Sequence, residues 1–179
     1  RRCSSNFCLL LFLLMSPARI YVKKISIFVD VQNIYYTTRS AYQRNFDYNK
    51  FWYEVTDGRE IVTAIAYAID RGDKKQIAFQ NILRAIGFDV KLKPFISRTD
   101  GSSKGDWDVG ITIDVMEFAP KSDIVVLASG DGDFSLLLRH IRAKFNTDTE
   151  VYGVRDLTSS TLQAEATIFK PIDDKFLLS

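Results

Sequence analysis

The sequence predicts a three-layer α/β fold, in which helices cover both faces of a central, mainly parallel sheet of five strands. Beyond residue 24, short apolar runs rich in β-branched and aromatic residues alternate with longer segments of helical period. The runs are apolar at consecutive positions, which is typical of strands buried on both faces of a parallel sheet. The hydrophobic content of 46% and the charged content of 26% are ordinary for a globular protein, and 179 residues suffice for one domain.

Each expected strand is an apolar run bounded by turn or helix signals. The first run ends at Asp30, and an Asp57-Gly58 turn precedes the second. The third run tolerates Pro94 because this residue lies near its end. In chain order, the five expected strands are residues 25–29, 61–69, 88–96, 124–128 and 150–154.

The expected helices are indicated by their apolar period and by their boundary residues. Asp73 is expected to cap the third helix, and Gly87 to end it. Pro120 stops the fourth helix, and Pro171 opens a tail after the last one. In chain order, the expected helices are residues 33–42, 49–55, 74–86, 106–118, 134–145 and 159–169, with a Gly/Ser-rich loop at residues 99–105.

Residues 1–18 do not match the rest of the chain, and we expect the domain to comprise residues 19–179. Arg1 and Arg2 precede an apolar run at 7–15, a pattern close to that of a secretory signal. The run is shorter than the roughly 20 apolar residues that span a bilayer. We expect the native protein to start at Met15, with residues 1–14 coming from upstream sequence. A real signal and an apolar tail packed on the domain are the alternatives.

The composition excludes several kinds of site. The chain has 2 Cys, both within its first eight residues, and 1 His, which is His140. Neither a zinc-binding spacing, a disulfide framework nor a His-based catalytic triad can be built from these residues. The net charge of +2 does not by itself indicate a nucleic-acid-binding protein, so the distribution of charge matters more.

Acidic residues gather at three places where a strand or loop leads into a helix. Asp30 ends the first strand, Asp108 lies in the Asp106–Asp114 segment, and Asp131 and Asp133 follow the fourth strand. The carboxyl ends of parallel strands share one edge, where ligands bind. Clustered carboxylates repel one another unless a cation lies between them, and hard divalent cations prefer oxygen ligands. The sequence therefore predicts a metal site formed by Asp30, Asp108, Asp131 and Asp133.

Several of these acids also have a structural interpretation. Asp30 could simply cap the next helix, but Asn33 adds a second polar group on the same side. Asp133 could cap the helix after the fourth strand, which would explain only one of the two acids there. Asp106 is expected to be an N-cap. Asp114 falls on the apolar stripe of its helix, so we expect it to support the site rather than to bind a ligand.

Basic residues flank the acidic positions, which suits a polyanionic substrate such as RNA. Arg98 and Lys104 precede Asp108, while Arg139 and Arg142 lie on the helix that follows Asp133. We expect these four residues to contact substrate, although a solvated surface position is an equally good interpretation for any one of them.

Three segments together resemble the NYN domain, and more closely its LabA-like branch, which is related to the PIN-domain nucleases. They are Ile-Phe-Val-Asp-Val-Gln-Asn at 27–33, Lys-Gly-Asp-Trp-Asp-Val at 104–109 with the later Asp114, and Val-Leu-Ala-Ser-Gly-Asp-Gly-Asp-Phe at 126–134. The resemblance covers about residues 24–173 and implies a PIN-like, Rossmann-like fold. It also implies a Mg²⁺ or Mn²⁺ site and RNA processing. The family's acidic positions fall on Asp30, Asp108, Asp131 and Asp133, with Asn33 alongside, and we expect Asn33 and Ser129 to contact substrate.

The chain departs from this family pattern at two places. One extra residue separates Lys104-Gly105 from Asp108, which leaves the role of Lys104 open. Thr167 stands where the family often carries Asp before an aromatic residue, so an acidic contribution from the last helix is in doubt.

The favoured hypothesis is a metal-dependent ribonuclease, acting in the cytoplasm on RNA, with no stable membrane association and with self-association left open. A bound Mg²⁺ or Mn²⁺ would activate water, so no protein nucleophile is required. The alternatives are a catalytically weak RNA-binding or regulatory module of the same fold and a metal-dependent phosphatase with Asp131 as nucleophile.

Overall fold

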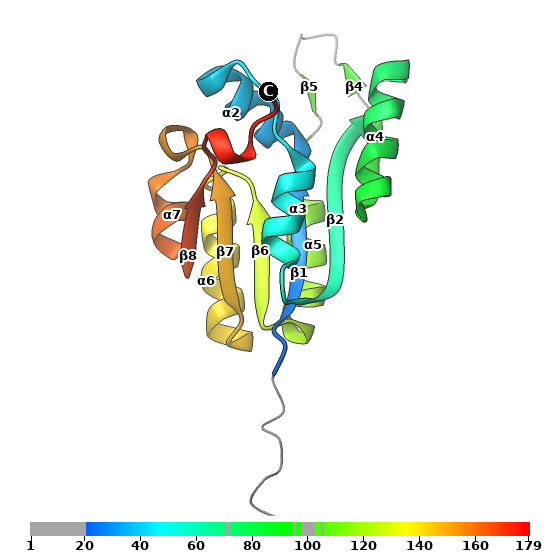
Figure 1. Ribbon diagram of the computed structural model, residues 1–179. Helices are drawn as coiled ribbons and strands as arrows, with labels where there is room; N and C mark the ends of the chain where they lie inside the picture. Colours follow the sequence, from blue (N-terminus) through cyan, green and yellow to red (C-terminus); the bar gives the residue numbers. More distant parts are fainter. Residues whose placement is uncertain (1–20, 71, 95, 98–102, 105) are drawn as a thin grey trace, which may run out of the picture.

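The computed structural model describes residues 21–70, 72–94, 96–97, 103–104 and 106–179. The expected extension at residues 1–18 therefore lies outside the described part of the chain. Strands and helices alternate from β1 onward, as the apolar pattern predicts (Figure 1). The strands are β1 (Lys24–Asp30), β2 (Glu60–Asp70), β3 (Asp89–Pro94), β4 (Ile96–Ser97), β5 (Ser103–Lys104), β6 (Ile124–Ala128), β7 (Asp148–Gly153) and β8 (Ile168–Pro171).

The central sheet has six strands in the order β3-β2-β1-β6-β7-β8, and every neighbouring pair is parallel. The expected α/β fold with a parallel sheet is thus confirmed, with one strand more than the five expected. The order of strands reverses between β1 and β6. The strands that follow β1 in sequence, β2 and β3, extend the sheet on one side, and those that follow β6, β7 and β8, extend it on the other. In such sheets, ligands bind beyond the carboxyl ends of the strands at the point of reversal.

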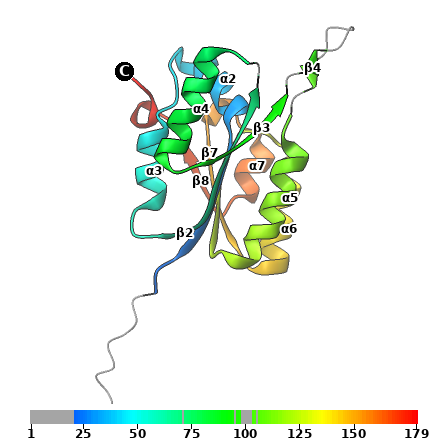
Figure 2. The same cartoon turned by 90° about the vertical axis from the view of Figure 1, so that its right-hand side faces the viewer.

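Helices cover both faces of the sheet, which gives three layers (Figures 1 and 2). One face carries α2, α3 and α4, and the other carries α5, α6 and α7. Alternate residues of β1 supply both cores, because Ile27 packs with the first set of helices and Phe28 with the second. The α-helices are α2 (Val31–Tyr42), α3 (Tyr48–Thr56), α4 (Lys74–Ile86), α5 (Asp108–Phe118), α6 (Phe134–Phe145) and α7 (Ser160–Glu165). No helix in the described ranges is both long and apolar enough to cross a membrane.

The sixth strand replaces the second half of the last expected helix. We expected one helix over residues 159–169, but α7 ends at Glu165 and Ile168–Pro171 pairs with β7. Two reciprocal hydrogen bonds join Thr149 to Thr167: each backbone N–H donates to the other residue's Oγ1, at 3.0 and 2.9 Å. These bonds draw the β-branched segment onto the sheet edge, which a helical period in the sequence cannot reveal.

Most other expected boundaries agree with the structure. Asp73 caps α4, since its carboxylate accepts a hydrogen bond from the Gln76 N–H at 2.9 Å, and Gly87 ends that helix. The third strand ends at Pro94, after which Ile96–Ser97 pairs with Ser103–Lys104 in an antiparallel arrangement. The expected loop at 99–105 falls largely outside the described residues.

Phe51 provides a test of the core that holds the α2–α3–α4 layer on the sheet. Its ring is fully buried, with ring centroids 5.4 Å from Phe46 and 5.0 Å from Tyr152. We predict that Phe51→Ala lowers the free energy of unfolding by about 3–5 kcal/mol in denaturant titrations, because it leaves a cavity. Tyr53 on the same helix is 73% exposed, so Tyr53→Ala should change this free energy by less than about 0.5 kcal/mol. Equal effects of the two substitutions would contradict the packing described.

Candidate metal centre

Asp30 lies at the carboxyl end of β1, where it is both the last strand residue and the N-cap of α2. Its Oδ1 accepts a hydrogen bond from the Asn33 backbone N–H at 3.0 Å, and its Oδ2 accepts one from Ser129 Oγ at 3.3 Å. Only 8% of the residue is exposed. Asp30 therefore caps the helix and also faces the neighbouring β6 loop, so the two interpretations of this residue are compatible.

The loop after β6 is held against the first turn of α2. Asn33 Oδ1 accepts a hydrogen bond from the Gly130 backbone N–H at 2.9 Å. Ser129 Oγ also accepts one from the Asp131 N–H at 3.2 Å. Gly130 is needed here because a Cβ would lie 2.9 Å from the carbonyl oxygen of Leu157. These hydrogen bonds hold Asp131, in the loop after β6, beside Asp30 at the end of the neighbouring strand β1.

The start of α5 is anchored on β2 by Trp107. Its indole N–H donates to the Ala68 carbonyl at 2.9 Å, and its ring centroid lies 5.3 Å from that of Tyr67. A Cβ on Gly110 would lie 2.6 Å from the indole ring, so glycine allows the ring to pack on the helix. This anchor places Asp108, in the first turn of α5, at the same sheet edge as Asp30.

The three acidic segments meet in one cavity, which we call the acidic cleft. Asp30 comes from β1, Asp108 from the start of α5, and Asp131 from the loop after β6. The cavity has a volume of about 320 Å³. It lies at the point where the strand order reverses, as expected for a ligand site in a sheet of this kind. Its lining consists of Asp30, Gln32, Asn33, Tyr36, Thr37, Ile69, Asp106, Trp107, Asp108 and Asp131.

Two of these carboxyl groups have raised pKa values. Burial raises the pKa of Asp30 above its ordinary value, opposed by the hydrogen bonds from Asn33 and Ser129 and reinforced by the charge of Asp131. Burial, followed by the negative charges of Asp131 and Asp106, raises the pKa of Asp108 to about 6. Holding these groups charged at neutral pH therefore costs free energy, which a bound cation would recover.

The donor chemistry of the cleft fits a hard divalent cation, although the ligands are not drawn together. Across the described ranges, no three His, Cys, Asp or Glu side chains form a group that could hold a metal ion. Mg²⁺ needs no such cage, because it keeps several of its waters and commonly binds through one or two carboxylates. Asp30, Asp108 and Asp131 supply oxygen ligands of that kind within one cavity.

The remaining predicted acids take other positions. Asp133 precedes α6, but its side chain is exposed, makes no capping hydrogen bond and does not line the cleft. The expectation that Asp106 is an N-cap is wrong, because α5 begins at Asp108 with Trp107 as its N-cap. Asp106 lines the cleft instead. Asp114 is buried on α5, where its carboxylate accepts hydrogen bonds from Tyr67 Oη at 2.6 Å and from Lys91 Nζ at 2.7 Å.

Two of the four predicted basic residues, Arg139 and Arg142, lie away from the cleft. Arg139 and Arg142 both pair with Glu165 of α7, at 2.6 and 3.2 Å, and neither lines the cavity. Their charges therefore join α6 to α7. Arg98 lies outside the described residues, and for Lys104 only the backbone is described, as part of β5. The cation of Lys93 lies near the cleft, because its Nζ donates to the Asp106 carbonyl at 2.7 Å.

Besides Asp106, sequence reasoning missed five residues that line the cleft. Tyr36 and Thr37 follow Asn33 by three and four positions, so a helical period starting at Asn33 would have found them. Gln32 borders the same surface of α2, and Ile69 lies near the end of β2, beside β1. Trp107 gives no such signal, because its role depends on the Ala68 carbonyl of another strand.

Comparisons with known proteins match most of the chain. A model of the NYN domain family matches residues 24–173. The "low amplitude and bright protein LabA" of Synechococcus elongatus is 30% identical over 132 residues, which cover 68% of this chain and 69% of that protein. A crystal structure of a protein of unknown function from Vibrio parahaemolyticus is 58% identical, with a TM-score of 0.85, and covers 89% of this chain and 98% of its own.

The raised pKa of Asp108 predicts a pH-dependent penalty on folding in metal-free buffer. Its folded value of about 6 exceeds the unfolded value of about 3.9, so the folded state binds the proton more tightly. Stability from this group is therefore lost as pH rises through about 6. Asp108→Asn should raise the melting temperature more at about pH 7.5 than at about pH 5, measured in EDTA.

The matched control for this measurement is Asp148→Asn, because Asp148 is exposed at the opposite end of the sheet, where β7 begins. Asp148 lies outside the cleft, so Asp148→Asn should not reproduce the gain in melting temperature expected of Asp108→Asn at about pH 7.5. A pH-independent effect of Asp108→Asn would contradict the penalty assigned to the cleft.

Proposed function

The chain belongs to the NYN domain family, and we propose that this nuclease-like domain hydrolyses RNA phosphodiester bonds with Mg²⁺ or Mn²⁺ bound in the acidic cleft. The observation that carries this proposal is the meeting of Asp30, Asp108 and Asp131, from three separate segments, in one cavity at the strand reversal. A structural role would not require three acids to share a cavity in which burial and neighbouring negative charges raise the pKa values of two of them, Asp30 and Asp108.

The metal would be held by one or two of the carboxylates of Asp30, Asp108 and Asp131 together with water, and Asp133 would add negative charge nearby. When bound, the ion supplies a water of lowered pKa and neutralises charge on the phosphate. In the reaction, the water oxygen bonds to phosphorus as a P–O ester bond breaks, and the proton lost by the water balances the one gained by the leaving oxygen. Ser129 and Asn33 orient the cleft by fixing Asp30 and the Gly130 loop.

RNA is proposed as the substrate on the basis of the NYN domain family. A bare acidic cleft would repel a polyanion, so RNA would enter it through bound cations and neighbouring basic residues. Lys93 is one described cation at its edge. A cytoplasmic location would suit this substrate. Two other activities are distinguishable in the same assay: a binding module would retain RNA without cutting it, and a phosphatase would hydrolyse a small phosphomonoester.

We predict that Asp30→Asn and Asp131→Asn each reduce Mn²⁺-dependent cleavage of a labelled single-stranded RNA by at least about 100-fold, since each removes a charged ligand. Asparagine preserves shape and remains a good N-cap, so Asp30→Asn should keep α2 intact. Melting temperatures of both variants in EDTA should equal or exceed that of the wild type, because one of several repelling charges is removed.

The control for cleavage is again Asp148→Asn, which changes an exposed acid at the far edge and should leave the rate unaltered. Equal rates in the wild type and in both cleft variants would refute the proposal. Cleavage that persists in EDTA would also refute it. Hydrolysis of p-nitrophenyl phosphate without cleavage of RNA would point to the phosphatase instead.

Metal binding can be measured without any activity. We predict that Mn²⁺ raises the melting temperature of the wild type, because a ligand at 100 times its dissociation constant stabilises the folded state by about 2.7 kcal/mol. The shift should be much smaller in Asp108→Asn and in Asp30→Asn, and unchanged in Asp148→Asn. A shift of equal size in all four proteins would place the metal elsewhere.

A further inference from the structure

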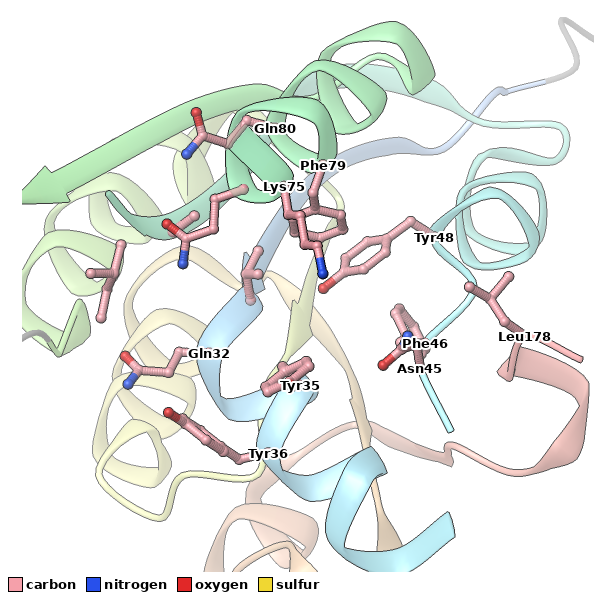
Figure 3. Close-up of a pocket in the computed structure, with 14 residues that line it drawn as sticks. Gln32, Tyr35, Tyr36, Asn45, Phe46, Tyr48, Lys75, Phe79, Gln80 and Leu178 are labelled. Carbon is pink, nitrogen blue, oxygen red and sulfur yellow. The ribbon is translucent and has the colours of Figure 1, made fainter. Parts of the chain in front are cut away.

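A second cavity adjoins the acidic cleft and has a different lining (Figure 3). Its volume is about 420 Å³, within the range of small-molecule sites. Gln32, Tyr36 and Ile69 line both cavities, so the two lie side by side around the first turns of α2. We call the second cavity the aromatic pocket, after the rings of Tyr35, Tyr36, Tyr48 and Phe79 that line it.

Two of these rings are presented to solvent rather than packed in the core. Tyr35 is 51% exposed, and its ring centroid lies 5.4 Å from that of Tyr36 in an edge-on arrangement. Phe79 and Tyr48 form a similar pair deeper in the pocket, with centroids 5.4 Å apart. Half-exposed rings at the mouth of a cavity offer flat faces on which a planar ring can stack.

One amide nitrogen of a residue that lines the pocket, Gln80 Nε2, has no hydrogen-bond partner. Gln80 of α4 is only 4% exposed, and its amide Nε2 is buried without a hydrogen bond. A buried N–H donor without an acceptor is uncommon because it loses its hydration without compensation. In Figure 3, α4 supplies Gln80 from one side of the pocket, and α2 supplies Gln32 and Tyr35 from the other. The Gln80 side chain borders this space, and its Nε2 would gain a partner if the side chain turned to face a hydrogen-bond acceptor of a ligand there.

Lys75 also lines the pocket, so a cationic group accompanies the rings and amides. A flat ring with acceptor atoms on its edge fits the rings and amides, and Lys75 suits a further phosphate of the same RNA strand. We propose that the aromatic pocket binds one nucleobase of the RNA strand whose phosphate lies in the acidic cleft. Tyr35 stacks on the base, and the Gln80 amide turns toward the pocket to donate to an acceptor on the edge of the base. This inference rests on the proposed function, because the cleft supplies the phosphate position.

A nucleobase is favoured over an apolar ligand because amides recur around the pocket. Gln32 and Asn45 line it together with Gln80, and a glutamine or asparagine amide can read the edge of a base by donating and accepting hydrogen bonds. Single-stranded RNA presents bases in a suitable form, since unstacked bases can enter a protein pocket and stack on aromatic side chains. The pocket would therefore confer a base preference on the position next to the scissile phosphate.

The test uses the four ribonucleoside 5′-monophosphates, with ribose 5-phosphate as the probe that lacks a base. Binding to the full chain is measured by isothermal titration calorimetry in the presence of Mn²⁺. We expect the wild type to bind at least one nucleotide about 10-fold or more tightly than ribose 5-phosphate. Tyr35→Ala should weaken nucleotide binding by about 5-fold or more through lost stacking. Gln80→Leu should weaken the preferred nucleotide by about 2- to 10-fold through one lost hydrogen bond.

Three controls separate base binding from damage to the fold. Gln80→Leu should melt at or above the wild-type temperature, because leucine is similar in size to glutamine and removes a buried amide nitrogen that has no hydrogen-bond partner. Tyr53→Ala changes a tyrosine that is 73% exposed and lies outside both cavities, so it should bind every nucleotide as the wild type does. Neither Tyr35→Ala nor Gln80→Leu should change the affinity for ribose 5-phosphate.

The outcomes distinguish this inference from the proposed function. If RNA is cleaved but Tyr35→Ala and Gln80→Leu bind nucleotides as the wild type does, the base site is wrong and the nuclease assignment stands. If the two variants lose base-selective binding but no RNA is cleaved, the pocket stands and the nuclease assignment fails. If no nucleotide binds more tightly than ribose 5-phosphate, the base site is overturned.

Discussion

The parallel pairing of β1 with β6 is the constraint on which the candidate site depends. These two strands are neighbours in space, although the chain between them builds four strands, β2 to β5, and four α-helices, α2 to α5. Because both strands run the same way, Asp30 at the end of β1 lies beside the Ser129–Asp133 segment after β6. The order of strands reverses at this pair, so helices leave it towards opposite faces and a cavity remains between them. An antiparallel pairing would put the two acidic segments at opposite edges.

Neutral contacts hold the charged groups of the site in place. Asn33 and Ser129 join α2 to the β6 loop, and Trp107 joins α5 to β2. None of these contacts neutralises a carboxylate, so the acids remain available to bind a cation. Burial and the negative charges of Asp131 and Asp106 raise the pKa of Asp108 to about 6. The protein thus keeps a cluster of like charges by attaching their backbones to a rigid sheet. The stability needed to do so comes from the two apolar cores on either side of β1.

Helix α2 serves two cavities because successive residues point about 100° apart. Asn33 and Thr37, one turn apart, line the acidic cleft, while Val31 and Tyr35 line the aromatic pocket. Gln32 and Tyr36 lie between these two sides and border both cavities. One helix capped by Asp30 therefore links a position suited to phosphate and metal with one suited to a planar ring. The capping hydrogen bond from Asn33 sets the rotation of both sides of the helix relative to the sheet.

The sequence by itself determined the alternation of strands and helices and the acidic positions at their junctions. Apolar runs, helical period and the caps at Asp73 and Gly87 are local properties, so they can be read without knowing the neighbours of each segment. Only the tertiary structure decided which polar groups meet. Thr167 pairs with Thr149 and turns the end of the last expected helix into a strand, and Glu165 takes up the charges of Arg139 and Arg142. Likewise, the Ala68 carbonyl determines where Trp107 and hence Asp108 lie. In each case the partner is distant in sequence, and packing of the helices on the sheet brings it within reach.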